Sequence, residues 1–126
     1  MLAAVRRAFS NVSSPHQKIF KADNHVGIAM SGLTADGTSA MKELRRNCIS
    51  HGFTFNSDIE VSRLAGSIAD KWQVVSQRAG SRPPGIGLLI SGKDAKGCHL
   101  YQVCPSGNLY NHNAIAIGAC FFCIIT

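Results

Sequence analysis

Residues 18–48 read KIFKADNHVGIAMSGLTADGTSAMKELRRNC, and the spacing of apolar residues changes part-way along this stretch. Apolar and polar residues alternate over 18–22 and again over 26–31, and a period of two is typical of β-strands. Residues 23–25 between them are Asp-Asn-His, a turn sequence, so the two strands should pair as a hairpin. Beyond residue 32 the apolar residues recur every three or four positions, which predicts a helix.

The predicted helix runs from about residue 35 to residue 51. Its apolar face is supplied by Ala40, Met41, Leu44 and Cys48. Thr34 is expected to be the N-cap, because its hydroxyl can accept a hydrogen bond from a free backbone N–H group. Asp36 in the first turn suits the helix dipole, and Gly52 stands where a C-cap is expected.

The rest of the chain continues with one more helix and then with strands. The patterns predict a short buried strand over 2–5, a second helix from residue 57 or 58, and strands over 86–91, 98–105 and 109–119. Glycines and charged residues over 92–97 mark the turn between two of these strands. An order of strands, two helices and strands favours a layered α+β fold over a parallel sheet.

Composition limits the classes of function. The 126 residues are 45 % hydrophobic and 16 % charged, which suits one globular domain or part of one. The formal net charge is +6, yet no basic run reaches five residues and few aromatic residues are interleaved with the basic ones. This pattern favours acidic protein partners over nucleic acid. The apolar stretch at residues 118–126 is too short to span a bilayer, so no membrane partner is expected.

Five cysteines and no secretory signal indicate a reduced, intracellular set of thiols. The candidate metal ligands are Cys98, His99, Cys104 and His112. Cys98 and His99 are adjacent, so in a strand their side chains point to opposite faces and cannot easily share an ion. The sequence therefore predicts neither a metal site nor a cofactor.

Two further motifs also fail as catalytic sites. Gly85 and Gly87 precede a predicted strand, whereas a phosphate-binding loop needs glycines ahead of a helix. Ser31 lacks the glycine two positions earlier that a nucleophile elbow requires. No catalytic residue is predicted, and from spacing alone Lys18 is a solvated strand lysine.

Four stretches of the chain carry a resemblance to a known family. They read DNHVGIAMSGLTAD at 23–36, VSRLAGSIADKWQ at 61–73, SRPPGIGLLISGKDAKGCHLYQVCPSGN at 81–108 and AIAIGA at 114–119. Together they resemble the α-type subunits of the 20S proteasome in one collinear match over about residues 2–119. The resemblance implies an α+β fold, the four-layer αββα sandwich of the N-terminal-nucleophile hydrolases, here incomplete. Residues 1–119 are then expected to be a partial α-type subunit domain truncated at both ends, and 120–126 a divergent apolar tail.

The resemblance also implies a function. The α-type subunits are non-catalytic structural subunits that form a ring and dock activators in ubiquitin-dependent protein degradation, in the cytoplasm and nucleus. The partners expected are neighbouring α subunits, β-ring subunits, and regulatory-particle ATPases or other activators. Two alternatives stay open: a basic nucleic-acid-binding module, and a catalytic β-type threonine protease. The latter needs a threonine freed at the mature N-terminus, whereas this sequence begins Met1-Leu2.

Two residues match the family's pocket for the C-terminal tails of activators. Lys18 stands directly before Ile19 and fourteen residues ahead of Gly32, which is the spacing the family shows. An ammonium group can pair with a terminal carboxylate, and a glycine lets an incoming backbone approach closely. The resemblance therefore implies that Lys18 and Gly32 line such a pocket.

Overall fold

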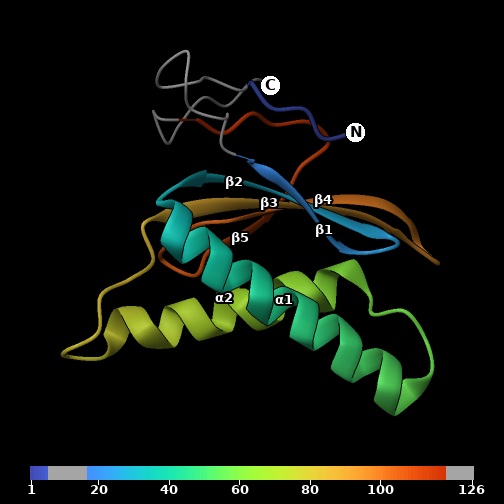
Figure 1. Cartoon of the computed structure of the whole chain (residues 1–126), viewed down its shortest axis with the longest axis horizontal. Coiled ribbons are helices and arrows are strands. Elements are labelled where there is room, and N and C mark those ends of the chain that lie inside the picture. Colours follow the sequence, from blue (N-terminus) through green and yellow to red (C-terminus); the bar gives the residue numbers. More distant parts are fainter. Residues whose placement is uncertain (6–16, 119–126) are drawn as a thin grey trace.

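Two helices cover one face of a five-stranded antiparallel sheet in the computed structural model, which describes residues 1–5 and 17–118 (Figure 1). In chain order the elements are β1 (Ile19–Asp23), β2 (Val26–Gly32), α1 (Thr34–Phe55), α2 (Val61–Gln77), β3 (Ile86–Asp94), β4 (Gly97–Val103) and β5 (Leu109–Asn111). The predicted α+β class is confirmed. The helices and the sheet are two layers of the expected four-layer sandwich.

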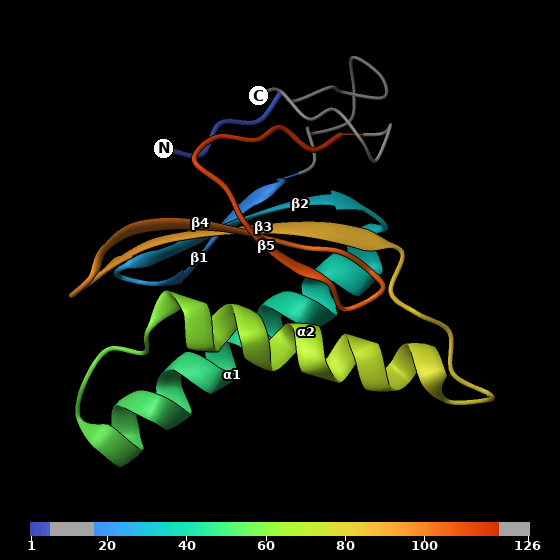
Figure 2. The same ribbon diagram turned by 180° about the vertical axis from the view of Figure 1, so that it is seen from behind.

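The strands lie in the sheet in their sequence order, β1-β2-β3-β4-β5, and every neighbouring pair is antiparallel. In the sequence, both helices lie between β2 and β3. In the sheet, these two strands pair directly with one another. Figure 2 shows α1 and α2 crossing beneath the sheet, while residues 1–5 and 113–118 lie on its other side. The sheet therefore separates the helices from both of these segments.

The core lies between the sheet and the two helices. β2 and β3 alternate so that Ile28 faces Ile90 in the ladder, and both side chains point at the helices. The helices contribute Ala40, Met41, Leu44 and Cys48 from α1, and Val61, Leu64, Ala65, Ile68, Ala69 and Trp72 from α2. Ala29 and its ladder partner Leu89 are buried on the opposite face of the sheet. The apolar face predicted for the first helix is confirmed.

The ends of α1 differ from the sequence prediction. Thr34 is its first helical residue, and the N-cap is Leu33, which makes no side-chain capping bond. The Leu33 N–H instead donates to the Gly85 carbonyl at 3.1 Å, extending the β2–β3 ladder up to the helix. At the other end the helix runs past Gly52 to Asn56, whose φ of 50° is left-handed. Asparagine tolerates that conformation, so it replaces glycine as the cap.

Other predicted bounds also move. Residues 2–5 form no strand, and the Val5 side chain is exposed rather than buried. α2 begins at Val61, three or four residues later than predicted, and the last strand shortens to Leu109–Asn111. The hairpin turn tightens because β3 continues to Asp94, whose carboxylate accepts a hydrogen bond from the Lys96 N–H. The predicted tail over 120–126 lies outside the described residues.

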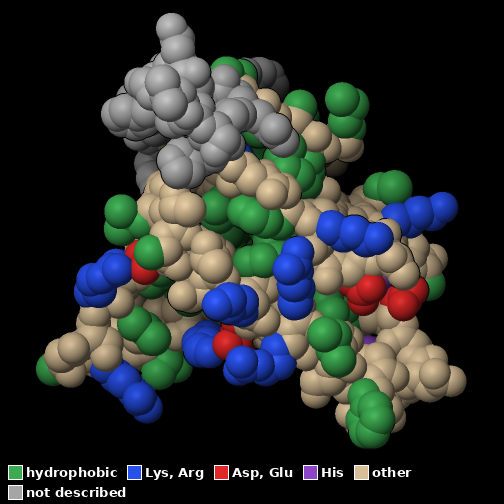
Figure 3. All heavy atoms as spheres, viewed as in Figure 1, with side chains coloured by type: hydrophobic (Ala, Val, Ile, Leu, Met, Phe, Trp, Pro, Cys, Tyr) green, Lys and Arg blue, Asp and Glu red, His purple; other side chains and the backbone are tan. Residues whose placement is uncertain are grey.

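Neither α1 nor α2 has the length and apolar character that a bilayer-spanning helix needs, and the described residues hold no other helix. On the face drawn in Figure 3, Lys and Arg side chains are spread among apolar and acidic ones. Several of them lie next to one another in the lower middle of that face, around an acidic side chain.

Candidate functional site

Lys18 lies one residue before β1, at the end of the hairpin that is remote from its turn. Its carbonyl accepts a hydrogen bond from the Met30 N–H at 2.9 Å, which sets Lys18 opposite Met30 across the ladder. Since Met30 packs in the core, the alternation of side chains assigns Lys18 to the helix side of the sheet. The residue is exposed, so its ammonium group is accessible to solvent.

Gly32 ends β2 at the same end of the hairpin, two positions beyond Met30. Its φ of 126° lies where side chains are strongly disfavoured. A Cβ added there would collide with the Gly85 carbonyl oxygen and would lie 2.9 Å from the Ile86 Cα. The joint therefore requires glycine for its own geometry. The role of Lys18 and Gly32 in a tail pocket stays a prediction.

Three residues near the β2–α1 junction, Asp36, Arg82 and Gly85, form a hydrogen-bonded cluster, called the clamp below. Arg82 donates to both carboxylate oxygens of Asp36 at 2.8 and 2.9 Å, and the Gly85 N–H donates to one of them at 3.0 Å. A bidentate guanidinium–carboxylate pair fixes direction as well as distance. The first turn of α1 is thereby fastened to the loop that enters β3.

The clamp sets the charge state of Asp36. The hydrogen bonds from the Arg82 guanidinium, and next the one from the Gly85 N–H, lower the pKa of the Asp36 carboxyl below its ordinary 3.8. Partial burial acts in the opposite direction but is the smaller effect. The ionised Asp36 carboxylate therefore has a structural role, because it accepts hydrogen bonds from Arg82 and Gly85 of the same chain.

A groove of about 350 Å³ lies between α1 and α2 beside the clamp. Its lining includes Trp72 together with Glu43 and Lys71, whose carboxylate and ammonium groups lie 2.9 Å apart. The Glu43–Lys71 pair joins α1 to α2, whereas the Asp36–Arg82 pair, which also lines the groove, joins α1 to the loop before β3. The arrangement suits joining the two helices rather than activating a nucleophile.

The four candidate ligands considered from the sequence do not come together. Cys98 is exposed, whereas the His99 ring lies 3.3 Å from an Asp94 carboxylate oxygen. His112 lies 3.0 Å from the Gln102 side-chain oxygen, and no three of the four gather among the described residues. The absence of a metal site at these four residues stays a prediction.

The other two motifs also lie where the sequence placed them. Gly87 is inside β3 and pairs with Ser31 in the β2–β3 ladder, so neither is part of a loop before a helix. Gly85 is in the loop that enters β3, where its N–H group is taken by the Asp36 carboxylate. No anion-binding turn is formed by these glycines.

Comparison with known proteins decides the family. A family model described as "Proteasome subunit" matches residues 1–124. The chain belongs to the proteasome subunit family. The resemblance seen in the four stretches is confirmed.

The relatives within the proteasome subunit family are α-type. The chain is 45 % identical to "Proteasome subunit alpha type-1" of Dictyostelium discoideum, covering 94 % of this chain and 48 % of that protein. It is 38 % identical to the alpha type-1 subunit of Drosophila melanogaster, covering 94 % and 43 %. It is also 38 % identical to "Proteasome subunit alpha" of Methanopyrus kandleri, covering 94 % and 49 %. The chain thus spans about half the length of these relatives.

These relatives bear on the functions that the sequence left open. All of them are named α subunits, so a catalytic β-type subunit and a nucleic-acid-binding module gain no support.

Sequence reasoning also missed part of the site. It read Asp36 only as a dipole partner and did not link it to Arg82. The sequence signal for this contact was the position of Arg82 directly before Pro83-Pro84, in the loop that leads into β3.

Proposed function

We propose that this chain acts as a non-catalytic structural subunit of the 20S proteasome α ring, contributing to ring assembly and activator docking in ubiquitin-dependent protein degradation. The observation that carries the proposal is the collinear match to α-type relatives over 94 % of the chain. The partners proposed are neighbouring α subunits and β-ring subunits, with regulatory-particle ATPases or other activators as docking proteins. The locations proposed are the cytoplasm and the nucleus.

The absence of catalysis belongs to the same proposal. A threonine protease of this family class needs a threonine whose own N-terminal amine helps activate its hydroxyl. The α-type names of the relatives support a subunit without that group. Proteolysis would then be a property of the assembled particle and not of this chain.

Lys18 and Gly32 are proposed to line a pocket for an activator's C-terminal tail. Two observations support this: both lie at one end of the β1–β2 hairpin, and both are exposed. The Lys18 ammonium group would pair with the terminal carboxylate of the tail, and Gly32 would let the tail's backbone approach. The pocket would be completed by a neighbouring subunit.

Assembly is tested by co-expressing the tagged chain with the remaining ring subunits and analysing native complexes by mass spectrometry. Stoichiometric recovery in a seven-membered ring is the expected result. Recovery of the folded chain alone, while the other subunits assemble without it, would contradict the proposed function. The folded state is verified by circular dichroism of the purified chain.

Docking is tested on those rings with an activator tail peptide in two forms, one with a free C-terminal carboxylate and one amidated. Lys18→Ala should weaken the carboxylate form about tenfold and leave the amidated form unchanged, since the lost contact is one charge-assisted pair. Lys21→Ala is the matched control, because Lys21 lies on the same strand and the opposite face. Equal effects of the two substitutions would refute the pocket.

A further inference from the structure

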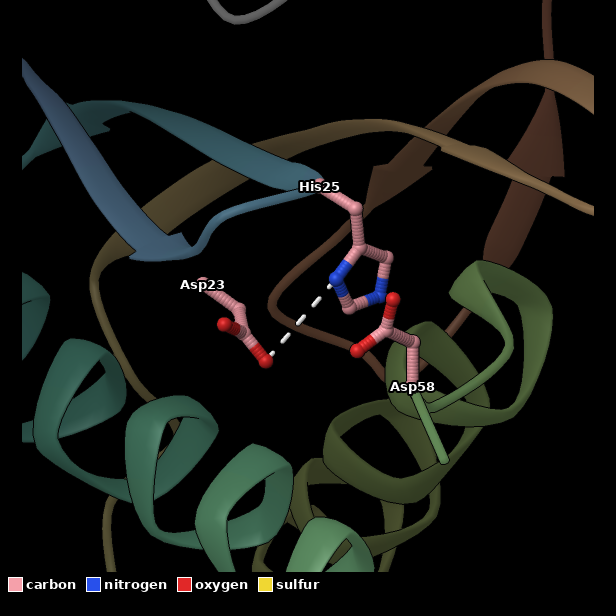
Figure 4. Close-up of side chains that lie close together, drawn as sticks. All are labelled: Asp23, His25 and Asp58. Carbon is pink, nitrogen blue, oxygen red and sulfur yellow. Dashed lines mark ion pairs between the residues drawn. The ribbon is translucent and has the colours of Figure 1, made fainter. Parts of the chain in front are cut away.

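The turn of the β1–β2 hairpin carries a group of possible metal ligands that the sequence analysis did not consider. Asp23 is the last residue of β1, His25 lies in the turn, and Asp58 reaches them from the segment between α1 and α2 (Figure 4). One ligand atom from each residue lies within 4.8 Å of the others. This is the one such trio of His, Cys, Asp or Glu side chains in residues 1–5 and 17–118.

The His25 ring is held in one orientation by a backbone contact. Its Nε2 lies 2.8 Å from the Ile59 carbonyl oxygen. A carbonyl can only accept, so Nε2 carries the hydrogen and Nδ1 of the neutral ring presents its lone pair. Metal-binding histidines commonly donate their second N–H to a carbonyl in this manner, which fixes the tautomer and aims the free nitrogen.

The free nitrogen is buried, and no residue in the described part of the chain gives it a hydrogen bond. The His25 side chain is 11 % exposed, and its Nδ1 lies 3.8 Å from Asp23 Oδ2, too far for a hydrogen bond. Buried polar atoms without a partner are uncommon in folded proteins. In Figure 4 this nitrogen and the Asp23 carboxylate face one another, with the Asp58 carboxylate beside the ring. The unfilled lone pair thus points to a cation among the three side chains.

Charge and spacing fit a divalent ion. One neutral imidazole and two carboxylates carry two negative charges, which a divalent cation balances. With metal–ligand distances of about 2.0–2.2 Å, tetrahedral donors lie roughly 3.3–3.6 Å apart, close to the His25–Asp23 separation. Asp58 is exposed, and one of its carboxylate oxygens lies within 4.8 Å of the ligand atoms of the other two residues. Mixed nitrogen and oxygen ligands favour Zn²⁺ over Ca²⁺ or Mg²⁺.

We propose that Asp23, His25 and Asp58 bind a Zn²⁺ ion that joins the β1–β2 turn to the segment between the helices. Ile59 is the positioning residue, because its carbonyl holds the His25 ring. Water fills the remaining coordination position. The site lies at the opposite end of β2 from Gly32, so it is separate from the proposed tail pocket.

The experiment measures Zn²⁺ binding to the full chain by isothermal titration calorimetry after chelator treatment. One site is expected, and Asp58→Asn should weaken binding at least tenfold. Asp58 is exposed, so this substitution leaves the core intact. Asp70→Asn is the matched control, since Asp70 is an exposed carboxylate on α2 outside the trio, and it should bind Zn²⁺ like the parent chain.

The cysteines require a second readout, because Cys120 and Cys123 have the spacing of a thiolate pair. X-ray absorption at the zinc edge of the chain carrying Cys120→Ser and Cys123→Ser should give nitrogen and oxygen ligands only, one of them an imidazole. Sulfur ligands in that variant would overturn the proposal. So would equal affinities of Asp58→Asn and Asp70→Asn, or no binding at about 1 mM Zn²⁺. The last result would assign the turn to a metal-free His25–Asp23 ion pair.

Discussion

Arg82 donates to both carboxylate oxygens of Asp36, although the two residues are 46 positions apart in the sequence. The contact joins the first turn of α1 to the loop before β3. It also holds the pKa of the Asp36 carboxyl below 3.8, so the stability contributed by this pair depends on pH.

Arg82→Ala should lower the melting temperature at pH 7, and this deficit should shrink as the pH falls below about 4. In the folded chain Asp36 stays ionised to a lower pH than in the unfolded chain. Its contribution is therefore complete above the ordinary pKa and is lost as the pH drops through the folded-state value. Thermal unfolding followed by circular dichroism from pH 3 to pH 8 measures the deficit.

Arg78→Ala serves as the control for this series, because Arg78 is an exposed arginine at the end of α2 that makes none of the ion pairs found in the described residues. It should leave the melting temperature unchanged at every pH. A deficit for Arg82→Ala that stays constant down to pH 3 would show that the pair does not act through the Asp36 charge.

Gly32→Ala should destabilise the chain by about 2–4 kcal/mol, because it combines a disfavoured positive φ with a backbone collision. Gly52→Ala is the same substitution inside α1, where nothing lies within 4 Å of the new methyl group. It should stabilise the chain by about 0.5–1 kcal/mol. Urea unfolding monitored by Trp72 fluorescence measures both, and effects of the same sign would be contrary to expectation.

Cys48 should resist alkylation while Cys98 reacts. Burial, and next the charge of Asp23, raises the pKa of the Cys48 thiol to about 11, so only about one molecule in a thousand carries the thiolate at pH 8. Cys98 is exposed. Peptide mass spectrometry after brief iodoacetamide treatment should find label on Cys98 and none on Cys48 until urea is added. Equal labelling without urea would mean that the α1 core face is open.

Leu44→Ala should cost about 2–5 kcal/mol of unfolding free energy, because Leu44 is completely buried against the sheet. Ile49→Ala removes a similar volume from the same helix at a position that is 73 % exposed, and should change stability by less than about 0.5 kcal/mol. Chemical unfolding of both variants makes the comparison. A similar loss for Ile49 would reveal that its face of α1 is covered in solution.

The sequence predicted the structure best where the residues of one helix or hairpin are enough to define it. The hairpin over β1 and β2 follows from alternation and a turn sequence, and the buried face of α1 follows from helical spacing. Those signals are local, so they can be recognised without knowing which segments pack against the element.

The predictions failed where a distant segment decides the outcome. Thr34 lost the N-cap position because Gly85 pairs with Leu33, and that contact forms only when β3 lies beside β2. The Asp36–Arg82 pair depends on the same approach. The His25 trio needs Asp58, which reaches the hairpin turn from beyond α1. The proposed pocket at Lys18 and Gly32 stays a prediction.

Gly32, the last residue of β2, pairs with Ile86, the first residue of β3. The chain therefore leaves the sheet before α1 and returns to it after α2 at the same point. During synthesis the β1–β2 hairpin can form early, but its next partner strand emerges only after both helices have been made. Closing so long a loop is slow, and until then one edge of β2 is open to wrong partners. Correct folding of the sheet therefore depends on how quickly α1 and α2 collapse onto its first hairpin.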